Sequence, residues 1–248
     1  MSKKTNYSYV GIALIILVFG ILFIPKIVDR ITNDDVTRDE SRSKKASTQI
    51  TDETSLSFLN INGERKKVPA FSFTNQNGKT ITNKDYEGKV YIVEFFFTTC
   101  PTICPRMSKN LVQIQNNFKG FKDFGVASFT INPDYDTPKV LKEYAEQYGM
   151  TNPNWHLMTG NIDVIYELAN QGFNLYTAKD DEAEGGFEHS GNFALIDKNG
   201  FIRSRTDAFG NPKIYYRGIV SEEEKYDDEG EEEEISILKE DIAKLLEE

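Results

Sequence analysis

Two cysteines are the residues of this sequence with the plainest chemistry. Cys100 and Cys104 are the only cysteines of the chain, and three residues separate them in the segment FFFTTCPTICPRM, 95–107. A spacing of four positions near a helical turn lets two sulfur atoms approach one point. Such a pair can form a disulfide, attack a substrate as a thiolate, or hold a metal ion. These five residues are compatible with all three.

The chain also has two histidines, which we interpret differently. His189 stands in GGFEHSGNFALID, between a glycine-rich acidic loop and a predicted hairpin strand. Its position at the rim of the predicted sheet favours a functional role. His156 stands in NWHLMTG, directly after the only tryptophan, and we interpret it as a structural residue of the surface or core.

The elements around the cysteines predict where they lie. The run KVYIVEFFF, 89–97, is apolar, aromatic and β-branched, which is typical of a buried central strand. The residues after the cysteines repeat apolar side chains at helical spacing from Met107 to Phe118, with Pro105 allowed at the first helical position. At the start of a helix, backbone N–H groups and the helix dipole stabilise a thiolate and lower its pKa.

The rest of the folded part alternates in the same way. Strands are predicted at 125–131 and 155–160, helices at 137–149, 161–171 and 235–248, and hairpins around Asn77-Gly78 and Asn199-Gly200. Strands that alternate with helices and then end in a hairpin and a last helix predict a sheet with helices on both faces.

Length and charge limit the possible classes of protein. A chain of 248 residues with 39% hydrophobic residues can bury one sizeable core. Two cysteines are too few for a small secreted disulfide scaffold. The formal charge of −10 comes from 222–248, which holds fourteen acids and three bases. We expect this acidic segment to be solvated and largely disordered up to its C-terminal amphipathic helix. No basic stripe suggests nucleic-acid binding.

The N-terminal part predicts a membrane anchor. The apolar run 9–28 is long enough to cross roughly 30 Å of hydrocarbon as a helix. A cleaved signal peptide is the alternative, but no small-residue cleavage site follows the run. Residues 1–30 are therefore predicted as a short N-terminal stub and a membrane anchor, and 31–55 as a flexible polar linker. The flanking charges are nearly balanced, so they do not set the orientation.

With these features, the chain resembles the SCO/SenC family of thioredoxin-fold copper chaperones for cytochrome c oxidase assembly. The resemblance covers roughly Leu56 to Thr206, and His189 follows Cys104 by 85 positions, close to the family's spacing. The segments that carry it are FFFTTCPTICPRM, DTPKVLKEYAEQYG, WHLMTG and HSGNFALIDKNG. It implies a thioredoxin-like three-layer sandwich with a mixed central sheet in 56–221, preceded by the single transmembrane helix and followed by the segment 222–248.

The sequence departs from the family's pattern at one position near the predicted site. The family usually has an aspartate where this chain has Asn132, in TINPDYDTP. Asp134 or Asp136 could substitute in part, or serve the loop and the cap of the next helix.

The resemblance implies copper as the ligand, held by Cys100, Cys104 and His189. Two thiolates and an imidazole suit Cu(I), and they suit Cu(II) if a fourth ligand completes the site. Zinc would accept the same donors with water. Cys100 and Cys104 would also form a redox-active disulfide, and its formation would release the metal. A metallochaperone of this kind needs no catalytic residue.

The implied partners and location follow from the same resemblance. The implied partners are the oxidase subunit that carries Cu(A) and another copper chaperone or a thiol reductant. The chain would contact the membrane through its N-terminal helix. We expect a single-pass protein of the inner (cytoplasmic) membrane with its soluble domain on the extracytoplasmic (periplasmic) side.

The alternative function is that of a thiol–disulfide oxidoreductase in which Cys100 attacks and Cys104 resolves. A peroxidase-like use of one cysteine is weaker, because it needs neither the second thiol nor His189.

Overall fold

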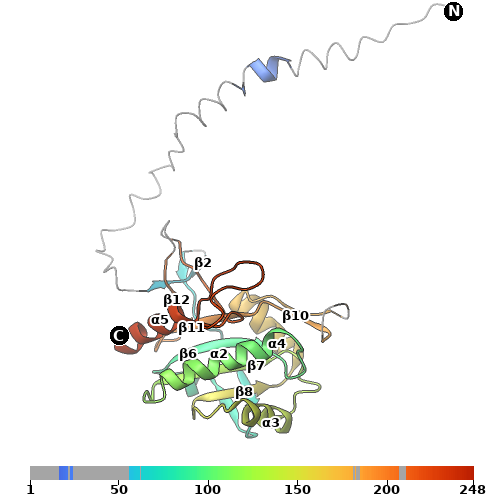
Figure 1. Ribbon diagram of the computed structural model, residues 1–248, viewed down its shortest axis with the longest axis vertical. Helices are drawn as coiled ribbons and strands as arrows, with labels where there is room; N and C mark the ends of the chain where they lie inside the picture. The colour runs from blue at the N-terminus through green and yellow to red at the C-terminus, as the bar shows by residue number, and fades with distance from the viewer. Residues whose placement is uncertain are drawn as a thin grey trace, which may run out of the picture. The chain divides into compact units, whose positions relative to one another are not determined.

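The protein is described from a computed structural model (Figure 1). The described residues are 17–21, 23–24, 56–61, 63–180, 182, 185–206 and 211–248. The chain divides into two compact units, Met1–Thr51 and Asp52–Glu248. Most of the predicted anchor at 9–28 and all of the linker at 31–55 lie outside the described residues. Among the residues that are described, no helix is both long enough and apolar enough to span a membrane.

Three parallel strands form the middle of the main sheet. They are β6 (Val90–Phe96), β7 (Phe124–Thr130) and β8 (Trp155–Thr159). Every residue of β6 and β7 is buried, as expected for parallel strands covered on both faces. The first of these strands is the one predicted to precede the cysteines.

Antiparallel strands extend the sheet on both sides. The order is β1-β12-β11-β6-β7-β8-β4-β5, and β13 also pairs with β11. The added strands are β1 (Ser57–Phe58), β12 (Ile202–Ser204), β11 (Asn192–Ile196), β4 (Ser72–Asn75), β5 (Thr80–Thr82) and β13 (Tyr216–Arg217). The sheet is therefore mixed, as predicted. The hairpins predicted at Gly78 and Gly200 are confirmed, and both glycines have the positive φ that their turns need.

Two further ladders lie outside the main sheet in the described part of the chain. One pairs β2 (Asn60–Ile61) with β3 (Glu64–Arg65). The other pairs β9 (Thr177–Lys179) with β10 (Phe187–His189), antiparallel. The β9–β10 ladder was not predicted from the sequence, and it carries one of the candidate site residues.

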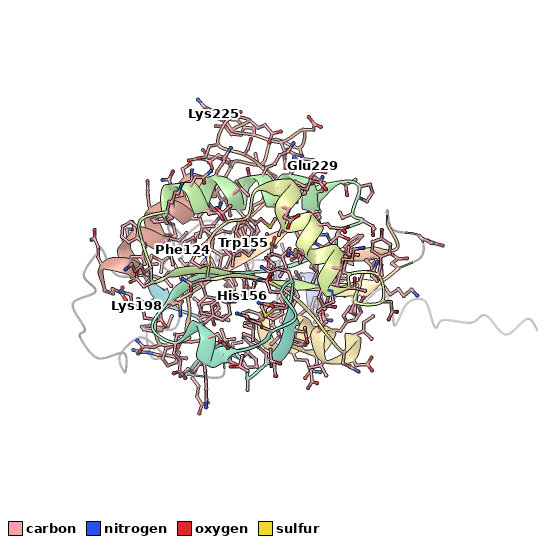
Figure 2. All side chains as sticks on the ribbon, turned by 90° about the horizontal axis from the view of Figure 1, so that it is seen from below. Phe124, Trp155, His156, Lys198, Lys225 and Glu229 are labelled. Carbon is pink, nitrogen blue, oxygen red and sulfur yellow. The ribbon has the colours of Figure 1, made fainter. Side chains whose placement is uncertain are left out.

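Helices cover both faces of the main sheet (Figure 2). The helical elements are η2 (Asn83–Tyr86), α2 (Ile103–Asn117), α3 (Pro138–Tyr148), α4 (Ile162–Glu167), its π-helical continuation η3 (Leu168–Phe173) and α5 (Ile235–Glu247). Phe96 packs against Tyr144 of α3, whereas its neighbour Phe95 packs against Phe173 of η3. Because successive strand residues point to opposite faces, α3 and η3 lie on opposite sides of β6.

The ends of the helices follow the sequence signals closely. Thr137 caps α3 by accepting a hydrogen bond from the backbone N–H of Val140, and Gly149 ends the helix in the left-handed conformation. The sequence predicted Pro105 at the first position of the helix. Helix α2 begins at Ile103, so Pro105 is its third residue. The N–H groups of the first turn have no partner within the helix, so this proline costs no helical hydrogen bond.

The prediction that the acidic segment is disordered is wrong. Arg217 forms ion pairs with Asp227 and Glu231, and Arg106 of α2 forms one with Glu224. Figure 2 shows Lys225 and Glu229 of this segment on the outer side of the helical layer that contains α2. Arg106 lies 118 positions before its partner, whereas Arg217 stands just ahead of the segment, 10 and 14 positions before its two partners. A count of local charge therefore overestimated the repulsion within the segment.

Helix α5 belongs to the same compact unit as the sheet. Its apolar face, which includes Ile235, Leu238 and Ile242, is fully buried, and the helix contacts both α2 and β6. The segment 222–248 is therefore joined to the core by buried apolar surface as well as by ion pairs.

Candidate metal centre

The cysteine pair lies at the junction that the sequence predicts, between β6 and α2. Residues 97–102 form a turn in which the N–H of Cys100 donates to the carbonyl of Phe97 over 3.3 Å. Cys104 is the second residue of α2, and its N–H donates to the Cys100 sulfur over 3.5 Å. Both cysteines are buried free thiols.

His189 meets the two sulfurs from the other side. It is the last residue of β10 and pairs with Thr177 of β9. Its Nε2 atom lies 3.3 Å from the Cys104 sulfur and 3.9 Å from the Cys100 sulfur. One ligand atom from each of these residues lies within 4.8 Å of the other two. The structure thus brings together the three residues predicted as metal ligands.

The imidazole of His189 points its Nε2 atom at the two sulfurs. The Phe97 ring contacts the His189 ring edge-on at 5.7 Å between centroids. The Nδ1 atom is buried and has no hydrogen-bond partner among the described residues. In a neutral imidazole that binds a metal through Nε2, the proton sits on Nδ1. A metal bound at Nε2 would therefore lie between the ring and the two sulfurs.

The two thiols have opposite shifts in pKa. The pKa of Cys100 is lowered to about 3, mainly by a hydrogen bond from the Cys104 thiol. Burial acts in the opposite direction, and contacts with His189 and with backbone N–H groups lower the pKa further. Burial and then the neighbouring Cys100 sulfur raise the pKa of Cys104 well above its usual value. At neutral pH the pair therefore holds one thiolate, at Cys100, and one proton, at Cys104.

This set of donors fits a soft metal ion. Two sulfurs and one imidazole nitrogen are the ligands that Cu(I) prefers, and zinc also accepts them. Binding both sulfurs as thiolates would displace the proton of Cys104, so metal binding would release a proton.

Two carboxyl groups are buried near the site. The sequence singled out Asp136, with Asp134, as a partial substitute for the aspartate expected at 132, and it assigned Glu94 no role. Asp136 is fully buried and accepts hydrogen bonds from Thr98, two positions before Cys100. Glu94, in the middle of β6, accepts a bond of 2.6 Å from Ser128, and burial raises its pKa to about 7. The signal for Glu94 was present in the sequence as a single acid within an apolar strand. No local pattern could show what Asp136 contacts.

The other residues singled out from the sequence lie elsewhere. His156, on β8, has its Nδ1 atom 3.2 Å from Asn75 Nδ2 and packs edge-on against the Tyr86 ring. Burial lowers its pKa, and it is not part of the group of metal donors. Asp134 is exposed, and Asn132 uses its backbone to hold the loop that contains Asp136.

Known proteins resemble this chain in sequence and in fold. The family model described as SCO1/SenC matches residues 60–222. The SCO1 protein homolog of Bacillus subtilis (strain 168) is 32% identical over 158 residues, which cover 63% of this chain and 80% of that protein.

Two solved structures extend the comparison. BsSco belongs to the Sco family of cytochrome c oxidase assembly proteins, and a disulfide switch has been identified in it. It superposes with a TM-score of 0.58 at 27% identity, over 73% of this chain and 94% of BsSco. Arabidopsis thaliana ScoI, crystallised with copper bound, superposes with a TM-score of 0.54 at 21% identity, over 73% of this chain and 99% of ScoI. At that identity the second match shows the fold alone.

These matches confirm the predicted mixed α/β fold of the thioredoxin-like type, and copper is the metal of the solved relative. The family model covers more than half of the sequence, including both cysteines and His189. The chain belongs to the SCO1/SenC family.

Proposed function

We propose that this protein binds copper through Cys100, Cys104 and His189 and delivers it for assembly of the Cu(A) centre of cytochrome c oxidase. The observation that carries the proposal is the convergence of two thiols and an imidazole nitrogen within 4.8 Å of one another. Membership of the SCO1/SenC family supports it.

The donors suit a metal that has to be passed on. With two thiolates and a neutral imidazole, a Cu(I) site would carry a formal charge of −1 and a Cu(II) site would be neutral. Oxidation of the two thiols to a Cys100–Cys104 disulfide removes two electrons and both sulfur ligands, so thiol oxidation and copper binding exclude each other. The disulfide switch identified in BsSco supports this coupling.

The location is part of the same proposal. The apolar run 9–28 would anchor the chain in the inner membrane, and the polar residues 31–55 would tether the folded unit on the extracytoplasmic side. Partners there would be the oxidase subunit that carries Cu(A), with another copper chaperone or a thiol reductant upstream. Family membership supports these partners.

A second candidate function is thiol–disulfide exchange, and the lowered pKa of Cys100 favours it. The Cys100 thiolate would attack a disulfide sulfur of a partner, which forms a mixed disulfide and releases one partner thiolate. The Cys104 sulfur would then attack Cys100, which completes the Cys100–Cys104 disulfide and releases the second partner thiol.

Metal analysis of the full chain tests the copper proposal directly. The reduced protein is mixed with equal amounts of Cu(I) and Zn(II), passed through a desalting column, and analysed for both metals and for free thiols. We expect one copper per chain, little zinc, and protection of both thiols. The sample oxidised to the disulfide is the control and should retain no copper. Retention of zinc in place of copper, or free thiols in the copper-loaded sample, would contradict the proposal.

A further inference from the structure

The turn that carries Cys100 lies beyond the last backbone bond of the parallel ladder. β6 and β7 pair from Val90 to Phe96, and the last ladder bond runs from the N–H of Ile131 to the carbonyl of Phe96 over 2.8 Å. From Phe97 onward, the segment no longer has a neighbouring strand of the sheet on this side. Its conformation up to Cys100 must therefore be held by other contacts.

The side chain of Asp136 makes the next connection between these two segments. Its Oδ2 atom accepts a hydrogen bond of 3.1 Å from the N–H of Thr98, and its Oδ1 atom accepts one from the Thr98 hydroxyl. Oδ2 also accepts a bond from the hydroxyl of Thr130, the last residue of β7. One carboxylate thus links the end of β7 to the residue two positions before Cys100.

Asp136 is itself held firmly. Its side chain is completely buried, and its N–H donates to the carbonyl of Asn132 over 2.9 Å. The next residue, Thr137, caps α3. The side-chain partners of the carboxylate are all threonine groups and none is a cation, in the part of the chain that the structure describes. A buried carboxylate without a cation is expensive unless hydrogen bonds satisfy it, so this arrangement is fixed by those bonds.

We infer that Asp136 is a positioning residue for the thiol pair, which it serves by fixing Thr98 and hence the turn that places Cys100 beside Cys104 and His189. The contacts at stake are the bond from the Cys104 N–H to the Cys100 sulfur and the approach of His189 Nε2 to both sulfurs. All of them belong to the dithiol form. Loss of the carboxylate should therefore destabilise this form relative to the disulfide.

The test is the dithiol–disulfide equilibrium of the metal-free full chain in glutathione buffers, read by trapping of free thiols. For Asp136→Ala we expect a shift of about 10-fold toward the disulfide, which corresponds to about 30 mV. Thr98→Val keeps the volume and the backbone donor and removes one hydroxyl, so a smaller shift in the same direction is expected. The inference concerns the thiols of the proposed copper site, but this equilibrium is measured without copper, so the two can fail separately.

Asp241→Asn is the matched control, because Asp241 is also a fully buried, hydrogen-bonded carboxylate, and it bonds to Arg205, Tyr216 and Lys244 rather than to the turn that carries Cys100. It should lower stability and leave the equilibrium unchanged. If Asp136→Ala proves unfolded, Thr98→Val decides. An equilibrium within 2-fold of the wild type in the folded variants, or an equal shift in Asp241→Asn, would overturn the inference and leave Asp136 a purely structural residue.

Discussion

Two of the buried clusters of polar side chains, the one around Asp241 and the one formed by the thiols and His189, differ in how many of their hydrogen-bonding groups are satisfied. In the cluster around Asp241, the carboxylate accepts bonds of 2.9 and 2.8 Å from Arg205 and one of 2.7 Å from the Tyr216 hydroxyl. In the thiol cluster, the sulfurs and His189 Nε2 approach one another at 3.3 to 3.9 Å, and His189 Nδ1 has no partner among the described residues.

The difference separates a structural cluster from a ligand site. Every group around Asp241 has a protein partner of complementary charge or polarity, so nothing remains to bind a further ion. The thiol cluster directs two sulfurs and one imidazole nitrogen at one another, and once the Cys104 proton is displaced these groups have bonding capacity for a metal. Burial alone does not distinguish the two, because Asp241 and Cys104 are equally inaccessible.

The largest expected effect is on metal binding when a sulfur is removed. Cys100→Ser or Cys104→Ser replaces a soft ligand by a hydroxyl that binds Cu(I) poorly, so we expect loss of stoichiometric copper binding. The free energy of unfolding should change by no more than about 1 kcal/mol, because the side chains keep nearly the same shape. Copper analysis and urea unfolding of the same samples measure both. A serine variant that keeps one copper per chain would contradict the assignment of the thiol cluster as the ligand site.

The Asp241 cluster should respond in the opposite way. Asp241→Asn removes the charge that pairs with Arg205, and we expect a loss of about 3 kcal/mol of stability with unchanged copper affinity. Urea unfolding and a copper competition titration provide the two measurements. A change in copper affinity of more than about 3-fold would show that the two clusters are not independent.

A smaller, pH-dependent effect is expected for Glu94. Burial raises its pKa from an ordinary value of 4.5 to about 7. Between these values the folded protein keeps the proton that the unfolded chain has lost, so stability falls as the pH rises through this window. Glu94→Gln removes that penalty. The amide group of the variant would lack a hydrogen-bond partner, which offsets part of this gain. The variant should be more stable than the wild type by about 2 kcal/mol at pH 8 and should gain nothing at pH 4.

Unfolding in urea at the two pH values, on metal-free protein, measures this difference. A variant that is equally destabilised at pH 4 and pH 8 would mean that Glu94 does not titrate in this range.

The smallest expected change is in the pH profile of thiol alkylation. Because the pKa of Cys100 is lowered to about 3, its thiolate fraction is constant above pH 5. The rate of alkylation by iodoacetamide, slow because the sulfur is buried, should therefore be nearly flat from pH 5 to pH 7. An ordinary thiol would react about 100-fold faster at pH 7 than at pH 5. Mass spectrometry of the peptide that contains both cysteines after partial reaction identifies the modified sulfur. A 100-fold rise would contradict the assignment of the thiolate to Cys100.

Much of the fold could be predicted because its signals are local. The apolar run of β6, the Thr137 and Gly149 caps of α3 and the Asn-Gly turns each determine their own element. The ligand set was predicted through the family resemblance and the rarity of cysteine and histidine. The structure places all three of these residues together.

What could not be predicted depends on contacts between distant parts of the chain. Arg106 pairs with Glu224, 118 positions later, in an acidic segment that local charge predicted to be disordered. Asp136 reaches Thr98, 38 positions earlier. The sequence suggested for Asp136 a loop, a helix cap or a partial substitute for the aspartate expected at 132, and it gave no sign of this contact. The ladder that holds His189 pairs segments separated by a glycine-rich loop, so no short-range turn signal marked it.

The comparison of the two histidines tests the central claim most directly, because only one of them lies in the thiol cluster. The wild type, His189→Ala and His156→Ala are titrated as reduced protein against a Cu(I) chelator under identical conditions. Loss of His189 removes one of three protein ligands, so copper affinity should fall more than the roughly 10–100-fold typical of a residue that only supports a ligand. His156→Ala should stay within about 3-fold of the wild type. If His189→Ala bound copper as tightly as the wild type, the metal centre would be wrongly assigned and thiol–disulfide exchange would become the leading function.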